Sequence, residues 1–431
     1  MLTIVPQLQQ YLDAKRWVVA YSGGVDSHVL LHQLVALSVD SNTPPVLAIH
    51  INHGLQVDAA QWQQHCESVC DNLSVDCTSI VVNVDGNGGV EQSARDARYR
   101  AFEQYLQAGD VLFQGHHLDD QAETVLMRLL NGSGPKGLGG IPAQRSLGGA
   151  ILVRPLLNYS KEDILNYAQQ QQLNWVEDMT NDNSRYDRNF LRNEIFPLLA
   201  QRWPSVKRNL SRSGLLSAEL SGEVAALAEA DLVACDYRAT DSSLCIDGLL
   251  TLSLNRRFSV LRQLALSLQD LPPSLALLAQ VNKALSAGSQ AHPLIKYADV
   301  EFRMSGARLS IMPHLKAVDS SSVYQWDGLS VLELDGVGSL QALVGHGRGL
   351  LCFDHAVVKY RQGGERCKPA GRGRSQTVKK LLQEYGIKPW LRDRVPLIYI
   401  DDQLAAVGDC WVCEDFLSPE GALGLQLIWR Y

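Results

Sequence analysis

The chain has 431 residues, 46% of them apolar and 20% charged, which is the composition of an ordinary soluble globular protein. It contains no apolar run near the length of a membrane-spanning helix, and its start lacks the basic and apolar blocks of a signal peptide, so we expect a cytoplasmic protein. Nine cysteines without regular spacing fit a reducing compartment, and the net charge of −7 counts against a nucleic-acid partner unless positive charge is gathered locally.

The first predicted unit is a strand, a glycine-rich loop and a helix. An apolar run at residues 17–21 precedes the loop, and apolar positions at helical spacing follow it. The loop consists of Ser22, Gly23, Gly24, Val25, Asp26 and Ser27. Its glycines permit positive φ and close approach to a ligand, and its hydroxyls and the N–H groups of the helix start can bind an anion. Since no Lys-Ser or Lys-Thr pair follows, we predict a loop for the phosphates of ATP that is not a Walker A loop.

Strand-like and helix-like segments then alternate up to about residue 215. Strands are predicted at 46–51, 80–84 and 111–114, and helices at 58–73, 90–106 and 118–130. This alternation predicts an α/β domain over residues 1–215 with a doubly wound, mostly parallel sheet. Ligands of such sheets lie at the carboxyl ends of the strands, so we expect the loop at 22–27 and the segment after 111–114 to face one crevice.

The segment after the strand at 111–114 is rich in acidic side chains. Asp119, Asp120 and Glu123 begin the helix at 118–130, where spacings of three and four residues place them on one face. Carboxylates at a helix start can be simple capping and dipole partners. Their place at a strand end, where the active site of such a fold lies, favours a catalytic role instead.

The pattern changes from about residue 216. Helices predicted at 215–232, 256–268 and 275–285 indicate a small helical domain over residues 216–315, with a hairpin formed by 300–304 and 308–311. Residues 316–431 are expected to form an α+β domain. Within it, residues 359–394 carry eleven basic and three acidic side chains, and a second basic stretch covers 185–212. Each is either a binding surface for a polyanion or a solvated basic face.

Several motifs of the chain together resemble the tRNA(Ile)-lysidine synthetases, a family with a pyrophosphate loop of the N-type ATP pyrophosphatase kind. The motifs are the 22–27 loop, His116-His117-Leu118-Asp119-Asp120-Gln121-Ala122-Glu123-Thr124, Arg154-Pro155-Leu156, Glu177-Asp178-Met179-Thr180-Asn181 and Arg188-Asn189-Phe190-Leu191-Arg192-Asn193. The resemblance covers the first 215 residues, is weak through the middle and returns at 363–366 and 388–390.

The resemblance implies a two-step ligase reaction that uses ATP with Mg²⁺. ATP adenylates the C2 oxygen of a cytidine in the anticodon loop of an isoleucine tRNA and releases pyrophosphate. The ε-amine of free lysine then attacks C2 and displaces AMP, which leaves lysidine. A loop base suits this chemistry because it is already unstacked and can enter a pocket.

The resemblance also assigns residues to this reaction. The catalytic positions are Asp26, Arg95, Asp120, Glu123 and Arg192. Asp120 and Glu123 would bind the ammonium group of lysine and accept its proton, because an amine with a pKa near 10.4 is almost wholly protonated at pH 7. Asp26 would act beside Mg²⁺ or the lysine, and the arginines would offset phosphate charge or hold the lysine carboxylate. Arg98, one turn from Arg95, is the alternative at that position.

The tRNA phosphates would be bound by Lys359, Arg361, Arg366, Arg372, Arg374, Lys379 and Lys380. Two alternatives stay open, namely a tRNA thiolase with the same ATP loop and a non-catalytic RNA-binding relative. The pairs Cys410/Cys413 and Cys66/Cys70 lack a matching second pair, so a metal cluster is weakly supported. The ligands of any metal are unknown, and the oligomeric state is open, with a homodimer among the alternatives.

Overall fold

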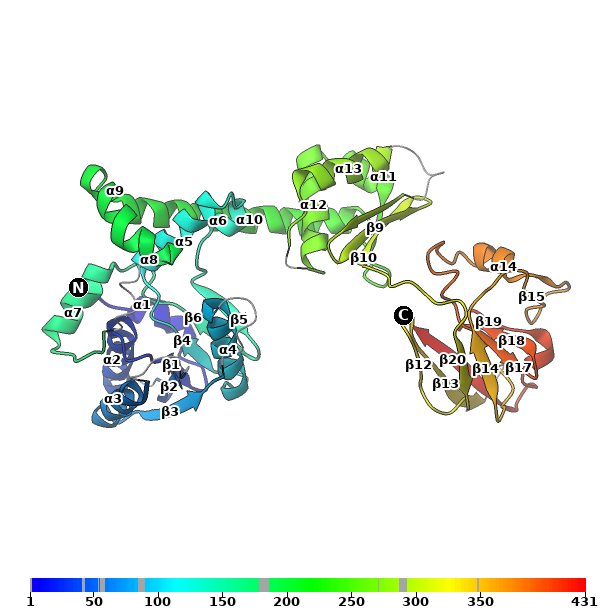
Figure 1. Cartoon of the computed structure of the whole chain (residues 1–431), viewed down its shortest axis with the longest axis horizontal. Helices are drawn as coiled ribbons and strands as arrows, with labels where there is room; N and C mark the ends of the chain where they lie inside the picture. The colour runs from blue at the N-terminus through cyan, green and yellow to red at the C-terminus, as the bar shows by residue number, and fades with distance from the viewer. Residues whose placement is uncertain are drawn as a thin grey trace. The chain divides into compact units, whose positions relative to one another are not determined.

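The computed structural model describes residues 2–40, 43–52, 54, 59–83, 90–177, 186–269, 271–286, 293–346 and 349–431. The chain divides into two compact units, Met1–Val224 and Ala225–Tyr431. The boundary between them falls within helix α10, Val206–Ala234 (Figure 1). Among the helices of the described ranges, none combines the length and the apolar character needed to cross a bilayer.

The first unit is built on a six-stranded sheet with the order β3-β2-β1-β4-β6-β5. Its parallel strands are β1 (Trp17–Ala20), β2 (Val46–Asn52), β3 (Asp76–Val81), β4 (Val111–Phe113) and β6 (Ala150–Val153), and β5 (Gln144–Leu147) is antiparallel to β6. The predicted doubly wound, mostly parallel sheet is therefore confirmed. Because the chain runs from β1 outward to β3 and then returns to β4, the strand order reverses between β1 and β4, where such sheets bind ligands.

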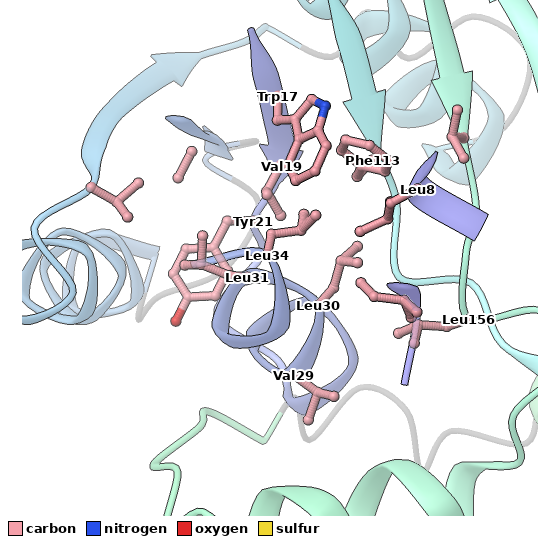
Figure 2. Close-up of a cluster of buried hydrophobic side chains, with 14 of the residues drawn as sticks. Leu8, Trp17, Val19, Tyr21, Val29, Leu30, Leu31, Leu34, Phe113 and Leu156 are labelled. Carbon is pink, nitrogen blue, oxygen red and sulfur yellow. The ribbon is translucent and has the colours of Figure 1, made fainter. Parts of the chain in front are cut away.

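Helices cover both faces of this sheet (Figure 1). One face is covered by α1 (Val5–Leu8), α2 (Val25–Asp40), α3 (Ala59–Asn72) and α7 (Lys161–Gln170), and the other by α4 (Val90–Tyr105). Figure 2 shows Trp17 and Phe113 packed near the leucines of α2. The next residue of β1, Val18, lies in the opposite layer with Phe102 of α4. Burial on both faces explains why these strands are continuously apolar.

The predicted position of the third strand is wrong by about four residues. The apolar run at 80–84 suggested that position, but β3 starts at Asp76 and ends at Val81. β3 is an edge strand whose residues are only partly buried, and it pairs with β2 from Leu47↔Asp76 to Asn52↔Val81. At an edge, backbone pairing rather than side-chain burial decides where the strand lies, so apolar content is a poor guide.

The first unit also contains shorter elements around the carboxyl ends of its strands. They are the 3-10 turn η1 (Gln9–Tyr11), α5 (Leu118–Leu130), α6 (Pro135–Leu138), α8 (Asp187–Phe190), the π-helical stretch η3 (Leu191–Ile195) and α9 (Phe196–Arg202). The bounds of α5 agree with the predicted helix at 118–130. Ala122 of α5 packs with Leu191 and Phe196 in a small separate core, which fixes the α8–α9 segment against α5.

The second unit begins with helices packed on a four-stranded antiparallel sheet. The helices are α11 (Ile246–Thr251), α12 (Leu254–Leu266) and α13 (Leu275–Ser286), and the sheet order is β7 (Ser243–Cys245), β10 (Arg308–Pro313), β9 (Val300–Ser305) and β8 (Leu294–Tyr297). The predicted hairpin is confirmed as β9–β10. The outer strands β7 and β8 are additions that the sequence pattern did not indicate.

The rest of the second unit is α+β, as expected. One sheet contains β11 (Val323–Trp326), β14 (Ala356–Lys359), β17 (Leu397–Ile400), β18 (Gln403–Val407) and β19 (Trp411–Val412). A second contains β12 (Leu332–Leu334), β13 (Gly338–His346) and β20 (Leu423–Arg430). A short pair, β15 (Arg366–Cys367) and β16 (Gln376–Thr377), precedes α14 (Val378–Glu384), and the turn η4 (Glu414–Phe416) precedes β20.

Candidate active site

The glycine-rich loop joins β1 to α2 at the point where the strand order reverses. Gly23 has a φ of 83°, and a Cβ there would lie 3.0 Å from the Sγ of Cys66, so both its backbone and its surroundings require glycine. The Ser27 hydroxyl accepts a hydrogen bond from the Ser22 N–H at 3.2 Å and donates to the Gly24 carbonyl at 2.9 Å. The loop is thus held in shape before any ligand binds.

A second loop, between β4 and α5, packs directly against this one. A Cβ on Gly115 would lie 3.0 Å from the carbonyl carbon and oxygen of Asp26, so only glycine lets the two loops approach this closely. The Nε2 of His117 lies 3.7 Å from Asp26 Oδ1 and 3.5 Å from Asp120 Oδ2. The loop at 22–27 and the acidic start of α5 therefore lie against each other at the carboxyl ends of β1 and β4, and we call this place the crevice.

His117 also begins α5 as its N-cap residue. Its Nδ1 accepts a hydrogen bond from the Asp119 N–H at 3.2 Å, and its own N–H donates to Asp120 Oδ2 at 3.0 Å. Capping is thus one role of Asp120, as the simpler interpretation of the acidic helix start anticipated. Capping uses Oδ2 of Asp120. It gives no role to Oδ1 of Asp120 or to the carboxylate of Glu123.

Two arginines bind Oδ1 of Asp120 and both carboxylate oxygens of Glu123. We call these four residues, Asp120, Glu123, Arg188 and Arg192, the carboxylate–guanidinium cluster. Arg188 donates from Nε to Glu123 Oε2 at 2.7 Å and from Nη2 to Asp120 Oδ1 at 2.8 Å. Arg192 donates from Nε to Glu123 Oε1 at 2.7 Å and from Nη2 to Glu123 Oε2 at 2.9 Å and to Asp120 Oδ1 at 3.3 Å. Glu123 is fully buried, whereas the side chains of Arg188 and Arg192 are 30% and 34% exposed.

The local sequence explains how both arginines reach the same partners. Arg188 and Arg192 are four residues apart, so they share a helical face. Arg192 lies in the π-helical stretch Leu191–Ile195, immediately before α9. Pro197 follows at the start of α9 and has no N–H, so it cannot make the regular bond to the carbonyl four residues earlier, and the preceding turn widens. Helical turns of this kind are frequent at functional sites.

The net effect of burial and neighbouring charges is to lower the pKa values of two groups at the crevice. Burial alone would raise the pKa of Asp120, but His117 and Arg188 outweigh it and lower this pKa to about 2. Burial, together with the charges of Arg154 and Arg188, lowers the pKa of His116 to about 3 against the opposing effect of Asp120. At neutral pH the crevice therefore contains an ionised Asp120 and a neutral His116.

Two lysines complete the set of ion pairs at the crevice. Lys161 Nζ lies 2.6 Å from Asp26 Oδ1, and Lys207 Nζ pairs with Asp119 Oδ2. Lys161 is the first residue of α7, directly after the N-cap Ser160, and its backbone N–H donates to Asp119 Oδ1 at 3.1 Å. The starts of α2, α5, α7 and α10 are thereby linked by two ion pairs and one backbone hydrogen bond.

The two remaining arginines of interest lie beside the crevice rather than on its carboxylates. Arg154 is buried and donates to His116 Nδ1 at 3.1 Å and to the Pro142 carbonyl at 2.7 Å. Arg95 is exposed on α4, with its guanidinium 5.2 Å from the centre of the Tyr99 ring. Within the described part of the chain, Arg95 has no ion pair with Asp26, Asp120 or Glu123. The structure therefore brings Asp26, Asp120, Glu123 and Arg192 together and places Arg95 at the periphery.

Sequence reasoning gave no role to Arg188 or Lys161. The sequence does contain a local pattern that could have pointed to each of these two residues. Arg188 precedes Arg192 by four residues, which is the spacing of a shared helical face. Lys161 follows Ser160, and Asp163 completes a capping box that marks the helix start. Neither signal names the partner, because the partners lie far away in the sequence.

The basic side chains predicted to bind tRNA lie on the second unit, and several have partners. Arg361 pairs with Asp393, Arg372 with Glu384 at 2.5 Å, and Lys380 more loosely with Glu384 at 3.8 Å. The other four have no ion pair in the described residues: Lys359 lies 5.1 Å from the centre of the Tyr399 ring, Arg366 donates to the Ser375 carbonyl at 3.1 Å, and Arg374 and Lys379 are exposed. Arg394 of the same basic segment is buried and donates to the Gly336 and Lys316 carbonyls, so it stabilises the fold.

The two cysteine pairs singled out in the sequence are not part of a metal-binding group in the residues that the structure describes. Cys410, Cys413, Cys66 and Cys70 are free thiols, and no group of three or more His, Cys, Asp or Glu side chains within these residues is arranged to bind a metal ion. The motif residues Asp178-Met179-Thr180-Asn181, as well as Arg185, lie outside the described residues.

Comparison with known proteins gives matches along most of the chain. A PP-loop domain model matches residues 2–199, a TilS substrate binding domain model residues 244–310, and a TilS substrate C-terminal domain model residues 356–429. The tRNA(Ile)-lysidine synthase of Coxiella burnetii is 40% identical over 405 residues, 92% of this chain and 89% of its own length. That of Serratia proteamaculans is 39% identical over 98% of both chains. Among solved structures, the U34-tRNA thiolase NcsA of Methanococcus maripaludis covers 50% of this chain and 76% of its own, at 18% identity and a TM-score of 0.43.

Proposed function

Because the chain belongs to the tRNA(Ile)-lysidine synthase family, we propose that the crevice between β1 and β4 joins free lysine to C2 of a cytidine in the anticodon loop of an isoleucine tRNA. The observation that carries the proposal is the direct packing of the ATP loop on the acidic start of α5, with His117 between Asp26 and Asp120. An adenylated base and a lysine held by these groups lie close enough to react.

The first step, adenylation, uses the loop at 22–27. The N–H groups of Gly23 and Gly24 and the hydroxyls of Ser22 and Ser27 bind the pyrophosphate portion of ATP, at the start of α2 where partial positive charge is concentrated. The C2 oxygen of the cytidine forms a bond to the α-phosphorus, and the bond from that phosphorus to pyrophosphate breaks. Fixed N–H and O–H donors aimed at the leaving group stabilise its charge without reorganising.

The second step uses the carboxylate–guanidinium cluster. Asp120 and Glu123 bind the ammonium group of lysine and take up the proton that it loses before it attacks C2. Asp120 Oδ1 and both oxygens of Glu123 already accept hydrogen bonds from Arg188 and Arg192. Lysine therefore enters by replacing guanidinium N–H groups, and the displaced arginine is free to bind a phosphate or the lysine carboxylate.

Mg²⁺ fits this crevice as a companion of ATP. Asp26 offers a half-exposed carboxylate at the start of α2, and Mg²⁺ prefers one or two carboxylates together with phosphate oxygens. When bound, the ion neutralises part of the charge of the triphosphate. The protein's own contribution is to hold Asp26 beside the glycine-rich loop, which the packing of Gly115 ensures.

We further propose a cytoplasmic enzyme with three functional parts. Residues 1–215 carry out catalysis, residues 216–315 contact the substrate tRNA, and residues 316–431 bind tRNA through their basic surface. The second unit offers exposed cationic side chains such as Arg374 and Lys379, which suit phosphate contacts that give affinity without base choice.

One experiment separates this function from its two alternatives. The full chain is incubated with ATP, labelled lysine and bulk tRNA, and in parallel with a labelled sulfur donor. ATP-dependent incorporation of lysine supports the proposal, whereas incorporation of sulfur would identify a thiolase. Retention of tRNA without any incorporation would identify a non-catalytic RNA-binding protein. A Glu123→Gln sample serves as the matched control, since it should retain tRNA and lose incorporation.

A further inference from the structure

The glycine-rich loop contains no cationic side chain of its own. Residues 22–27 include only glycine, serine, valine and aspartate. In phosphate loops of the Walker A kind, a lysine within the loop reaches the β and γ phosphates and balances their charge. In this chain any cationic side chain that offsets the charge developing on pyrophosphate has to come from another element of the fold.

Lys161 is the lysine that the structure places on this loop. Its Nζ lies 2.6 Å from Oδ1 of Asp26, and its side chain is 37% exposed, so it can reach a ligand in the crevice. Asp26 is in the first turn of α2, immediately after the glycines. The ammonium group is therefore held at the edge of the phosphate loop by a carboxylate of that loop.

The position of Lys161 is fixed by the fold. Ser160 caps α7, and the Lys161 N–H is bonded to Asp119 at 3.1 Å. The body of α7 is anchored on α2, since Ile164 and Ala168 are fully buried in the core that they share with α2 and His32 Nδ1 pairs with the Tyr167 hydroxyl at 2.9 Å. The backbone at Lys161 is thus rigid relative to α2, and only its side chain has to move.

The other cations of the crevice are bound elsewhere. Arg188 and Arg192 are bound to Asp120 and Glu123, and Lys207 is paired with Asp119. Among the lysine and arginine side chains of the described residues, Lys161 is the one with an ion pair to the glycine-rich loop. Lys161 therefore lies beside the loop that is expected to bind phosphates, whereas Arg188 and Arg192 lie on the carboxylates that are expected to bind lysine.

We propose that Lys161 is a further catalytic residue, which contacts the phosphates of ATP and stabilises the transition state of adenylation. The inference rests on the proposed function and specifies the first of its two steps. As the cytidine C2 oxygen bonds to the α-phosphorus, the bond from that phosphorus to the β-phosphate oxygen breaks, and its electron pair goes to the leaving pyrophosphate. The ammonium group of Lys161 passes from Asp26 to the phosphate oxygens and balances this charge.

The test measures pyrophosphate release and lysidine formation by the full chain with tRNA and ATP. Lys161→Met should lower kcat for pyrophosphate release by about 10²–10³-fold, the usual effect of removing one donor to a developing oxyanion. The KM for lysine should change little, because the carboxylate–guanidinium cluster is intact. Lys161→Arg, which keeps the charge, should recover at least a tenth of the wild-type rate.

Lys207→Met is the matched control, because Lys207 also pairs with an aspartate of the crevice and its side chain is likewise 37% exposed. If Lys161 only neutralised a carboxylate and held a helix, the two methionine variants would lose similar activity, and thermal melting would show a similar loss of stability. That result, or a Lys161→Met enzyme with a normal kcat, would overturn the inference. A wild-type chain that makes no lysidine would instead refute the proposed function.

Discussion

The buried carboxylate of Glu123 gives the most decisive prediction. Glu123→Gln keeps the shape of the side chain but removes the charge that faces Arg188 and Arg192. Breaking a fully buried ion pair by removing one partner costs about 3–5 kcal/mol. Since about one-third of each arginine side chain is exposed and can be solvated, we expect a loss of about 2–3 kcal/mol from the free energy of unfolding of the first unit.

The measurement is a double-mutant cycle with Glu123→Gln, Arg192→Gln and the pair of changes together. Because the chain has two units, opening of α5 is followed by hydrogen-exchange mass spectrometry in urea rather than by a single global signal. The two changes should be coupled by about 1–3 kcal/mol, as expected for groups in one hydrogen-bonded network. Glu103→Gln, an exposed change on α4, should stay within about 0.5 kcal/mol of the wild type.

Activity gives the second half of the same prediction. Glu123→Gln should reduce lysine incorporation by at least about 100-fold while tRNA retention stays near the wild-type level, since tRNA phosphates are bound elsewhere. A coupling near zero would show that the cluster is solvated and contributes no buried pairing. Normal lysine incorporation by a folded variant would remove Glu123 from the chemistry altogether.

Three further predictions concern other groups. Arg188→Gln should raise the affinity of the free chain for lysine in isothermal titration calorimetry, because fewer guanidinium bonds have to be replaced, and an unchanged affinity would contradict the exchange that we describe. The double change Lys379→Glu and Lys380→Glu should weaken tRNA binding and make its salt dependence shallower by about 1–2 in the log–log slope, whereas normal binding would identify this region as a solvated face. His116 has a folded-state pKa of about 3, below the unfolded value of about 6.5, so as pH falls below 6.5 only the unfolded state takes up its proton. Stability should therefore fall by about 1.4 kcal/mol per pH unit from this group, and His116→Gln should remove that part of the slope in denaturant titrations between pH 6.5 and 5.

Much of the first unit could be predicted because its signals are local. The strands β1 and β4 are short apolar runs followed by residues typical of loops, and α5 shows both a capping pattern and helical periodicity. The edge strand β3 was misplaced because half-exposed strands carry little apolar signal. The strands β7 and β8 were not predicted, because each has only three or four residues and lies at an edge of its sheet, where the apolar pattern is weak.

The sequence by itself determined which chemical groups the crevice contains. The glycine-rich loop and the acidic start of α5 are each formed by consecutive residues, so their backbone conformation and side-chain chemistry can be predicted without knowing the rest of the fold. Tertiary structure alone decided which charges meet. Arg188 reaches Glu123 across 65 residues and Lys161 reaches Asp26 across 135, pairings that depend on the strand order and on how α7 and α8 pack. Periodicity and propensity act over a few residues, whereas an ion pair between distant segments forms only where the packed fold brings two charges together and excludes water.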